Sequence, residues 1–228
     1  MTFVLIIFGW QEDTYMKLGR IAENFHRPRM GRRLAALLAS QLIMGICVAV
    51  FKTIGFGTDP CSTFTLGVAA HTGISFGTCQ FTFNLLLFLP VIFLDLSRIG
   101  IGTVINMVGV GYTADICMRL IGAHMPAGGL SIVMRIVLFV AAMTAFLIAV
   151  GFYVAVDLGV APYDAIPQLI TAHTDKLSGR TIRMLWDLSY LVIGFLLGST
   201  VGLTTVISGF CLGPAIAFVS GRVKNWFE

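Results

Sequence analysis

Two stretches of the chain, GTDPCSTFTLGVAAHT (residues 57–72) and GVAPYDAIPQLITAHT (residues 159–174), decide the fold, because the second repeats the pattern of the first. Each begins with Gly, has Pro three residues later and ends in Ala-His-Thr, and the two begin 102 residues apart. Further matches follow in the same order: Ser75 with Ser178, Thr78 with Thr181, Asn84 with Asp187, Gly100 with Gly202, and Gly111 with Gly213. An ordered series of this kind favours an internal duplication over a chance likeness between Gly- and Thr-rich helices.

The composition indicates a membrane protein. Apolar residues make up 57% of the chain and charged residues 11%, whereas a soluble domain has about 25% charged residues. So few charges do not cover a water-facing surface, and we expect lipid to be the solvent. The five cysteines stand singly in apolar segments and form no CxxC pair, so neither a disulfide framework nor a metal site is expected.

Six segments are apolar enough to be read as crossings of the bilayer, which takes about 20 residues. They are Leu34–Thr53, Phe76–Leu94, Ile99–Gly122, Ile132–Val156, Thr181–Leu197 and Val201–Ser220. The predicted fold is therefore all-α, with one membrane domain (33–221) made of a first repeat (33–122) and a second repeat (130–221). Residues 1–32 form a cytoplasmic or peripheral segment. Its first fifteen residues are too short an apolar run to span, and we expect them to be poorly ordered or peripheral.

The basic residues predict the orientation. With the N-terminus in the cytoplasm, twelve of the fifteen Lys and Arg residues lie on the cytoplasmic side, and only Lys52, Arg119 and Arg135 lie outside. The net charge of +4 is then a topology signal beside a lipid surface, and no nucleic-acid partner is expected. Six crossings place both termini in the cytoplasm.

An odd number of crossings in each repeat has a geometric consequence. Three crossings return the chain on the opposite side, so the second copy enters the membrane upside down relative to the first. The charge pattern agrees, because the linker after the second span holds Arg98 and its counterpart at residues 198–202 has no charge. Inverted repeats occur in many secondary transporters, whose binding sites lie near the midplane where the repeats meet.

The two Pro-led segments, Asp59–Thr72 and Pro162–Thr174, are predicted to be half-helices. As helices they would be about 20 Å long, too short to cross, and they are either re-entrant or interfacial. Pro60 and Pro162 suit a first helical turn, and Asp59 suits the N-cap. Ala161 has no capping side chain, so Asp164 is expected to substitute for it in part. Helix N-termini attract anions, whereas Asp59 and Asp164 suit a cation or a proton-coupled ligand; the sequence leaves both choices open.

Four more residues are candidate site residues. His71 and His173 end the two half-helices, either as proton acceptors or as residues that satisfy the last helix carbonyls. Asn84 and Asp187 lie at equivalent places within spans, where an ionisable group is costly and marks a functional site by default. The alternative for Asp187 is an ion pair with Arg183 or Arg180.

The glycine- and threonine-rich motifs resemble a known family. They are LGVAPYDAIPQLIT (158–171), the Ser-Gly-Arg-Thr at 178–181, GSTVGLTTVISGFCLGP (198–214), GFGTDPCSTFTLGVA (55–69) and RIGIGTVINMVGVGYTADI (98–116). These stretches are similar to the bacterial membrane proteins grouped as the YczE/YyaS/YitT family. That resemblance implies a multi-pass protein of the bacterial inner membrane and carries no catalytic residues over to this chain.

Three functions compete at this point. The favoured one is a small secondary transporter or permease for an unidentified solute, with its site between the repeats. The second is a non-transporting membrane partner or regulatory protein. The third is a membrane enzyme acting on lipids, with His71 and Asp59, or His173 and Asp164, as its best candidate groups. No nucleotide-binding or hydrolase motif is present, so we expect neither an enzyme nor a cofactor. A homodimer remains open.

Overall fold

The structure is a computed structural model that describes residues 27–126, 128–174 and 176–227. The expectation for residues 1–15 falls outside these ranges. All regular structure in the described ranges is helical, and the α-helices begin and end close to the predicted bounds. They are α2 (Met30–Ile54), α3 (Pro60–Thr72), α4 (Phe76–Leu94), α5 (Ile101–Ala123), α6 (Ile132–Ala155), α7 (Pro162–Ala172), α8 (Gly179–Leu196) and α9 (Leu203–Val223), with short 3-10 helices η1 (Leu96–Arg98) and η2 (Lys224–Trp226).

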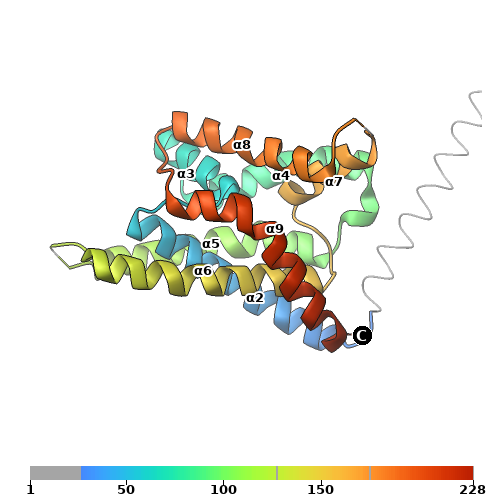
Figure 1. Cartoon of the computed structure of the whole chain (residues 1–228), viewed down its shortest axis with the longest axis horizontal. Helices are drawn as coiled ribbons and strands as arrows, with labels where there is room; N and C mark the ends of the chain where they lie inside the picture. Colours follow the sequence, from blue (N-terminus) through green and yellow to red (C-terminus); the bar gives the residue numbers. More distant parts are fainter. Residues whose placement is uncertain (1–26, 127, 175, 228) are drawn as a thin grey trace, which may run out of the picture.

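The helices form two layers (Figure 1). The longer helices α2, α5, α6 and α9 make one layer, in which α2 packs on α5 and α6, and α6 packs on α9. Helices α3, α4, α7 and α8 make the other layer, in which α3 packs on α8 and α7 packs on α4. Contact between α4 and α5 joins the layers.

Local capping signals explain where several helices begin. The Asp59 carboxylate accepts a hydrogen bond from Ser62 N at 3.0 Å and caps α3. The hydroxyls of Ser75 and Ser178 accept from the amides of the residues three positions later and cap α4 and α8. The early amide of Gly77 in α4 also donates to Asp115 of α5 at 2.8 Å. The duplicated Ser-x-x-Thr pattern therefore has the same structural role in both copies.

The main core lies between α2 and α6. Phe51 is fully buried and packs against Phe146 and Phe139, with ring centroids 5.8 and 6.5 Å apart. Between α2 and α5 the core contains a polar pair, in which Asn106 Nδ2 donates to Gln41 Oε1 at 3.0 Å. This hydrogen bond satisfies Asn106 Nδ2 and Gln41 Oε1, groups that would otherwise be costly in an apolar interior, whereas Gln41 Nε2 is buried without a partner among the described residues.

The outside of the molecule is strongly apolar. Large side chains such as Phe93, Val133 and Phe210 are 76%, 67% and 62% exposed, which suits a surface covered by lipid. In the described residues, α2, α4, α5 and α6 are long and apolar enough to span a membrane, and the bent halves of the α9 region make a fifth span if they count as one. This is fewer than the six that the sequence predicted. Helix α8 is missing from the count because Arg180, Arg183 and Asp187 lie within its 18 residues.

Candidate functional site

Arg183 of α8 is the centre of the candidate site. Its Nη1 donates to Asp164 Oδ1 of α7 at 2.6 Å, and its Nε donates to Asp187 Oδ2 one turn further along α8 at 2.9 Å. The hydroxyl of Tyr163 donates to the other oxygen of Asp187 at 2.7 Å. One guanidinium therefore joins two carboxylates from two helices. We call Asp59, Tyr163, Asp164, Arg183 and Asp187 the charged cluster.

Asp59 belongs to the charged cluster although Arg183 does not bind it. It lies within electrostatic range of Asp187, and its carboxylate accepts a hydrogen bond from Ser62 N. Because Asp59 precedes α3 and Asp164 lies in the first turn of α7, the N-termini of both half-helices meet at the cluster. The sequence predicted this convergence only as one of two arrangements, and the structure brings the ends together.

The cap of α7 differs from the prediction. Asp164 does not substitute for the missing side chain of Ala161, because its carboxylate is bound by Arg183. The amide of Ala161 donates instead to the hydroxyl of Tyr153, which comes from α6 at 2.5 Å. A residue of the preceding helix, eight positions earlier in the chain, thus satisfies the backbone at this helix start, and Asp164 stays available to the charged cluster.

Aromatic rings form one wall of the charged cluster. The centroid of Tyr190 lies 4.8 Å from that of Trp186, 5.1 Å from Phe64, 5.2 Å from Phe83 and 5.4 Å from Tyr163. The guanidinium of Arg183 lies over the Tyr163 ring at 5.4 Å. These rings cover one side of the ion pairs, whose side chains remain 33% (Arg183), 31% (Asp164) and 13% (Asp187) exposed. Only the Trp186–Tyr190 pair, one turn apart on α8, could be predicted from spacing, because the other rings come from different helices.

The first copy carries neutral groups where the second carries charges. With the 103-residue offset that follows the insertion, Gln80 and Asn84 of α4 correspond to Arg183 and Asp187 of α8. Asn84 is 2% exposed, and its Nδ2 donates to the Gln80 backbone oxygen at 3.0 Å. The predicted symmetry between Asn84 and Asp187 is therefore one of position, and at these two positions only the second copy carries charged side chains.

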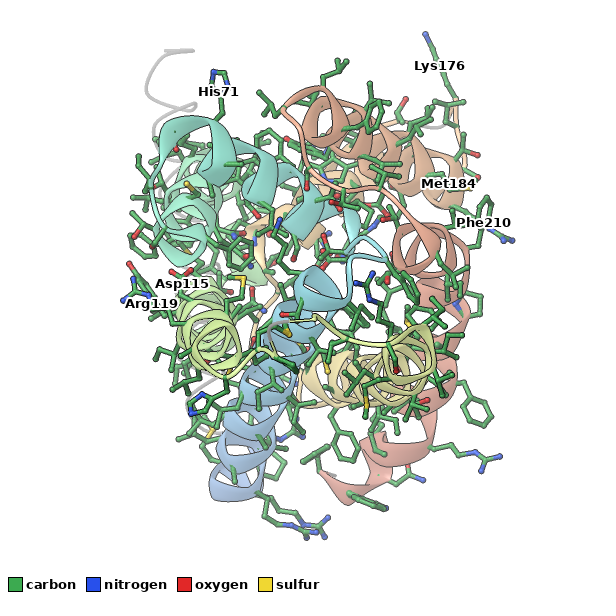
Figure 2. The ribbon with its side chains drawn as sticks, turned by 90° about the vertical axis from the view of Figure 1, so that its left-hand side faces the viewer. His71, Asp115, Arg119, Lys176, Met184 and Phe210 are labelled. Atoms are coloured by element: carbon green, nitrogen blue, oxygen red, sulfur yellow. The ribbon has the colours of Figure 1, made fainter. Side chains whose placement is uncertain are left out.

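The two histidines lie away from the charged cluster. His71 is exposed at the outer edge of the molecule (Figure 2), at the opposite end of α3 from Asp59. His173 follows the last turn of α7, where its Nδ1 lies 2.9 Å from the Leu169 carbonyl oxygen. The structure thus favours the capping interpretation for His173. It brings neither histidine to the carboxylate proposed as its enzymatic partner.

The loop after α4 is tied to α7 on the outside of the bundle. Arg98 binds Asp95 at 3.0 Å and also Gln168 of α7. Partial burial acts to raise the pKa of Asp95, but the hydrogen bonds from Ser97 and the charge of Arg98 outweigh it. The pKa of Asp95 therefore lies below its usual range, and this carboxyl group is a structural anion rather than a proton carrier.

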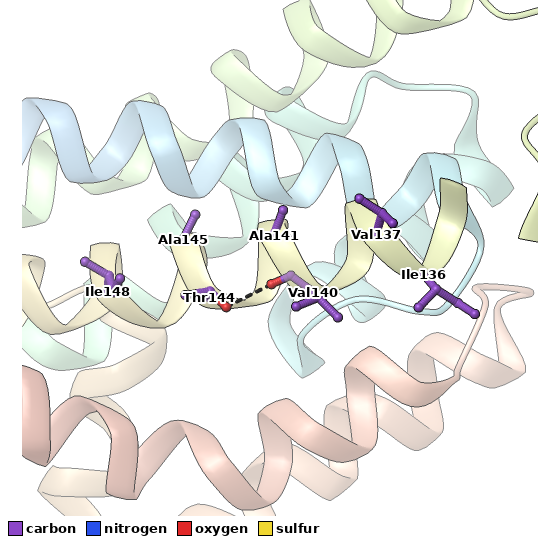
Figure 3. A pocket seen from close by; sticks show the side chains of 7 residues that line it. All are labelled: Ile136, Val137, Val140, Ala141, Thr144, Ala145 and Ile148. Atoms are coloured by element: carbon purple, nitrogen blue, oxygen red, sulfur yellow. Dashed lines mark hydrogen bonds between the residues drawn. The ribbon is translucent and has the colours of Figure 1, made fainter. Parts of the chain in front are cut away.

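An open apolar groove of about 700 Å³ runs along α6. Figure 3 shows its lining on α6, between α2 and α9. The lining residues are Ile136, Val137, Val140, Ala141, Thr144, Ala145 and Ile148. None of them belongs to the charged cluster, so the groove and the cluster are separate features. Among the described residues, no group of three His, Cys, Asp or Glu side chains is placed to hold a metal ion.

The apolar helices and their lipid-like exterior indicate a multi-pass membrane protein. The chain belongs to the family of unknown function DUF6198, which matches residues 31–221. A Haemophilus influenzae protein named "Uncharacterized protein" is 25% identical over 187 residues, which cover 82% of this chain and 83% of that protein. No solved structure matches the chain. These comparisons do not test the resemblance to the YczE/YyaS/YitT proteins, which stays a prediction.

Proposed function

We propose that this protein is a small secondary transporter of the bacterial inner membrane, with both termini in the cytoplasm and a solute site at the charged cluster. The observation that carries the proposal is the position of Arg183, which binds carboxylates of both α7 and α8 where the N-terminus of α3 also arrives. Ionisable groups of this density within an apolar bundle are costly for the fold, and a function is the usual reason for keeping them.

Pairs of equivalent contacts support the inverted repeat on which the proposal depends. Gly102 N donates to Leu158 O at 2.7 Å, and the equivalent Thr204 N donates to Phe56 O at 2.9 Å. Phe56 follows the end of α2, and Leu158 follows the end of α6. Arg33, near the start of α2, binds Val156 at the end of α6, so the two helices run antiparallel. The two contacts therefore lie at opposite ends of the α2–α6 pair. Contacts exchanged in this way are expected if a pseudo-two-fold axis in the membrane plane relates the two copies.

The charges of the cluster favour coupling to protons or another cation. Asp164 and Asp187 share the guanidinium of Arg183, and a third carboxyl group, that of Asp59, lies within electrostatic range of Asp187. Arg183 neutralises one of these three charges, and unpaired negative charge is expensive in an apolar site, so the excess favours binding of protons, a cation or a basic group of the solute. A transporter that exchanges a cation for a proton would bind each of them in turn at this excess of carboxyl groups.

The test begins with the purified protein in detergent and a panel of small organic cations, zwitterions and anions. A solute that binds the folded state raises the melting temperature, and that solute is then assayed for uptake into proteoliposomes. We expect stabilisation and uptake to be lost in Asp187→Asn. They should be kept in Asp115→Asn, whose side-chain oxygen still accepts from Gly77 outside the cluster. Equal uptake in the two variants would overturn the assignment of the site.

The groove along α6 favours a second candidate function, a membrane partner protein that transports nothing itself. The groove is apolar, open at the surface and unconnected to the charged cluster. This candidate predicts that the native protein purifies with a stoichiometric partner and that a bulky Ala141→Trp substitution in the groove releases it. Solute uptake by the isolated protein would rule this candidate out.

A further inference from the structure

A buried arginine closes one end of the molecule. Arg33 is 5% exposed, and its Nη1 donates to Val156 O at 2.6 Å while its Nη2 donates to Phe227 O at 2.8 Å. Arg33 thereby ties the start of α2 to the end of α6 and to the C-terminal segment. Terminal carbonyls of a helix lack partners within the helix, so a cationic donor there is strongly held.

The same face carries a second, more exposed contact. Arg27 forms an ion pair with Asp157, which directly follows Val156. Asp157 has a φ of 49°, a left-handed conformation that Asp and Asn tolerate better than most residues. Arg33 and the Arg27–Asp157 pair together form what we call the Arg33 latch.

The repeat supplies an equivalent arginine at the opposite end. Arg135 lies 102 positions after Arg33, and the two share one contact: Arg33 Nε donates to Pro28 O at 3.0 Å, and Arg135 Nε donates to Leu130 O at 3.2 Å. Both acceptors lie five residues before their arginine. This shared contact shows that the two side chains leave the backbone in equivalent surroundings.

The remaining contacts of the two arginines differ. The equivalents of Val156 and Phe227 are Ile54, the last residue of α2, and Met125. Within the described part of the chain, Arg135 makes no hydrogen bond to either of them, and its side chain is only partly buried. Ile54 and Phe139, one turn after Arg135, belong to the same core cluster, so the end of α2 and the start of α6 face a common core.

From this asymmetry we infer that Arg33 and Arg135 are alternating latches of the two faces, with the Arg33 latch closed and the Arg135 latch open in this conformation. In the opposite conformation Arg135 binds Ile54 O at the end of α2, and Arg33 releases the end of α6. A bistable pair of this kind lets the chain open its charged cluster to one side at a time. The inference rests on the proposed transporter, and its test needs no solute.

Two pairs of spin labels related by the repeat measure the exchange. The first pair, at positions 35 and 154, reports the distance from the start of α2 to the end of α6. The second, at positions 137 and 52, reports the opposite end. All four positions are exposed, with Val137 at 57% and Val154 at 45%. Labels are attached to introduced cysteines in the full chain, after the native cysteines are replaced, and distances are measured by pulsed electron paramagnetic resonance in nanodiscs.

We expect Arg33→Met to lengthen the 35–154 distance and shorten the 137–52 distance by a few ångströms. Arg135→Met is the matched control and should change neither, because its latch is open here. Lengthening at 35–154 alone would overturn the inference and reduce Arg33 to a local structural tie. Unchanged distances in both pairs, or the same shifts in the Arg135 variant, would overturn it as well.

A milder variant keeps the inference testable if Arg33→Met does not fold. Asp157→Asn removes the ion pair with Arg27 but retains a residue suited to the left-handed backbone. It should shift both distances in the directions expected for Arg33→Met, to a smaller extent. Unaltered distributions in a folded Asp157→Asn protein would refute the latch, whatever the uptake assay shows about transport.

Discussion

The amide of Gly102 donates to the carbonyl oxygen of Leu158 at 2.7 Å, across the boundary between the two halves of the chain. The next residue of the second half, Gly159, has a φ of +113°, and a Cβ added to it would lie 2.6 Å from Gly100 N. Its equivalent, Gly57, has a φ of +82°, and an added Cβ would lie 2.6 Å from Gly202 N. Each half therefore depends on a glycine to approach the other.

Alanine at either of these glycines should destabilise the protein strongly. Gly57→Ala and Gly159→Ala meet both an unfavourable backbone conformation, worth about 1–2 kcal/mol, and a clash with backbone. Gly73→Ala is the control, because Gly73 has a φ of +73° but nothing within 4 Å of the added Cβ. Thermal unfolding in detergent should show a larger loss for the first two variants. Equal losses in all three would mean that the close approach of the halves contributes nothing.

The first copy suggests how the ion pairs of the second can be removed safely. Arg183→Gln/Asp187→Asn gives α8 the amide pair that α4 has at Gln80 and Asn84. Arg183→Gln alone leaves the carboxylates of Asp164 and Asp187 without their cation, and we expect it to unfold at lower temperature than the double variant. A double variant less stable than the single one would contradict this.

Asp59 both caps α3 and carries a negative charge, and two substitutions separate these properties. Asn is as good an N-cap as Asp, so Asp59→Asn should keep the melting temperature while removing a negative charge from the charged cluster. Asp59→Ala loses the cap and should cost about 0.5–2 kcal/mol in the free energy of unfolding. If the transporter is proton-coupled, uptake by Asp59→Asn no longer responds to a pH gradient. A normal response would remove Asp59 from the coupling mechanism.

The contact between α3 and α8 depends on Gly194. A Cβ on this residue would lie 2.7 Å from Thr63 O, and α3 approaches reciprocally through Gly67. Gly194→Ala should therefore push α8 away from α3 and lower the melting temperature. Gly209→Ala in α9, where nothing lies within 4 Å, should be neutral or stabilising by up to about 1 kcal/mol, as expected for alanine in an open helix. The same loss in both variants would argue against a close-packed α3–α8 contact.

Sequence patterns predicted those parts of the fold that depend on local chemistry. The bounds of α4 agree with the prediction, and α3 and α7 begin at Pro60 and Pro162, because capping residues, prolines and apolar runs act over a few residues. The expected ion pair of Asp187 with Arg183 follows from their spacing on one helix turn. The predicted fifth span, Thr181–Leu197, does not count as a membrane span in the structure, because α8 carries Arg180, Arg183 and Asp187 among its 18 residues.

The remainder of the candidate site required the tertiary structure. Asp164 and Arg183 are 19 residues apart and meet only because α7 packs beside α8. Tyr153 caps α7 from another helix, which no local pattern of α7 reveals. The histidines drew attention by their repetition, but repetition of a helix end explains them, and the charged chemistry lies at the other ends of the same helices.

The unequal polar pairs of α4 and α8 have a consequence for how such a protein arises. Two identical subunits would place a guanidinium and a carboxylate on both sides of their axis and would bury twice the charge in lipid. Joining the copies in one chain frees one of them to keep only amides at Gln80 and Asn84, while the other specialises in ionic chemistry at Arg183 and Asp187. The two halves of one chain can therefore carry different chemistry at equivalent positions, which identical subunits cannot.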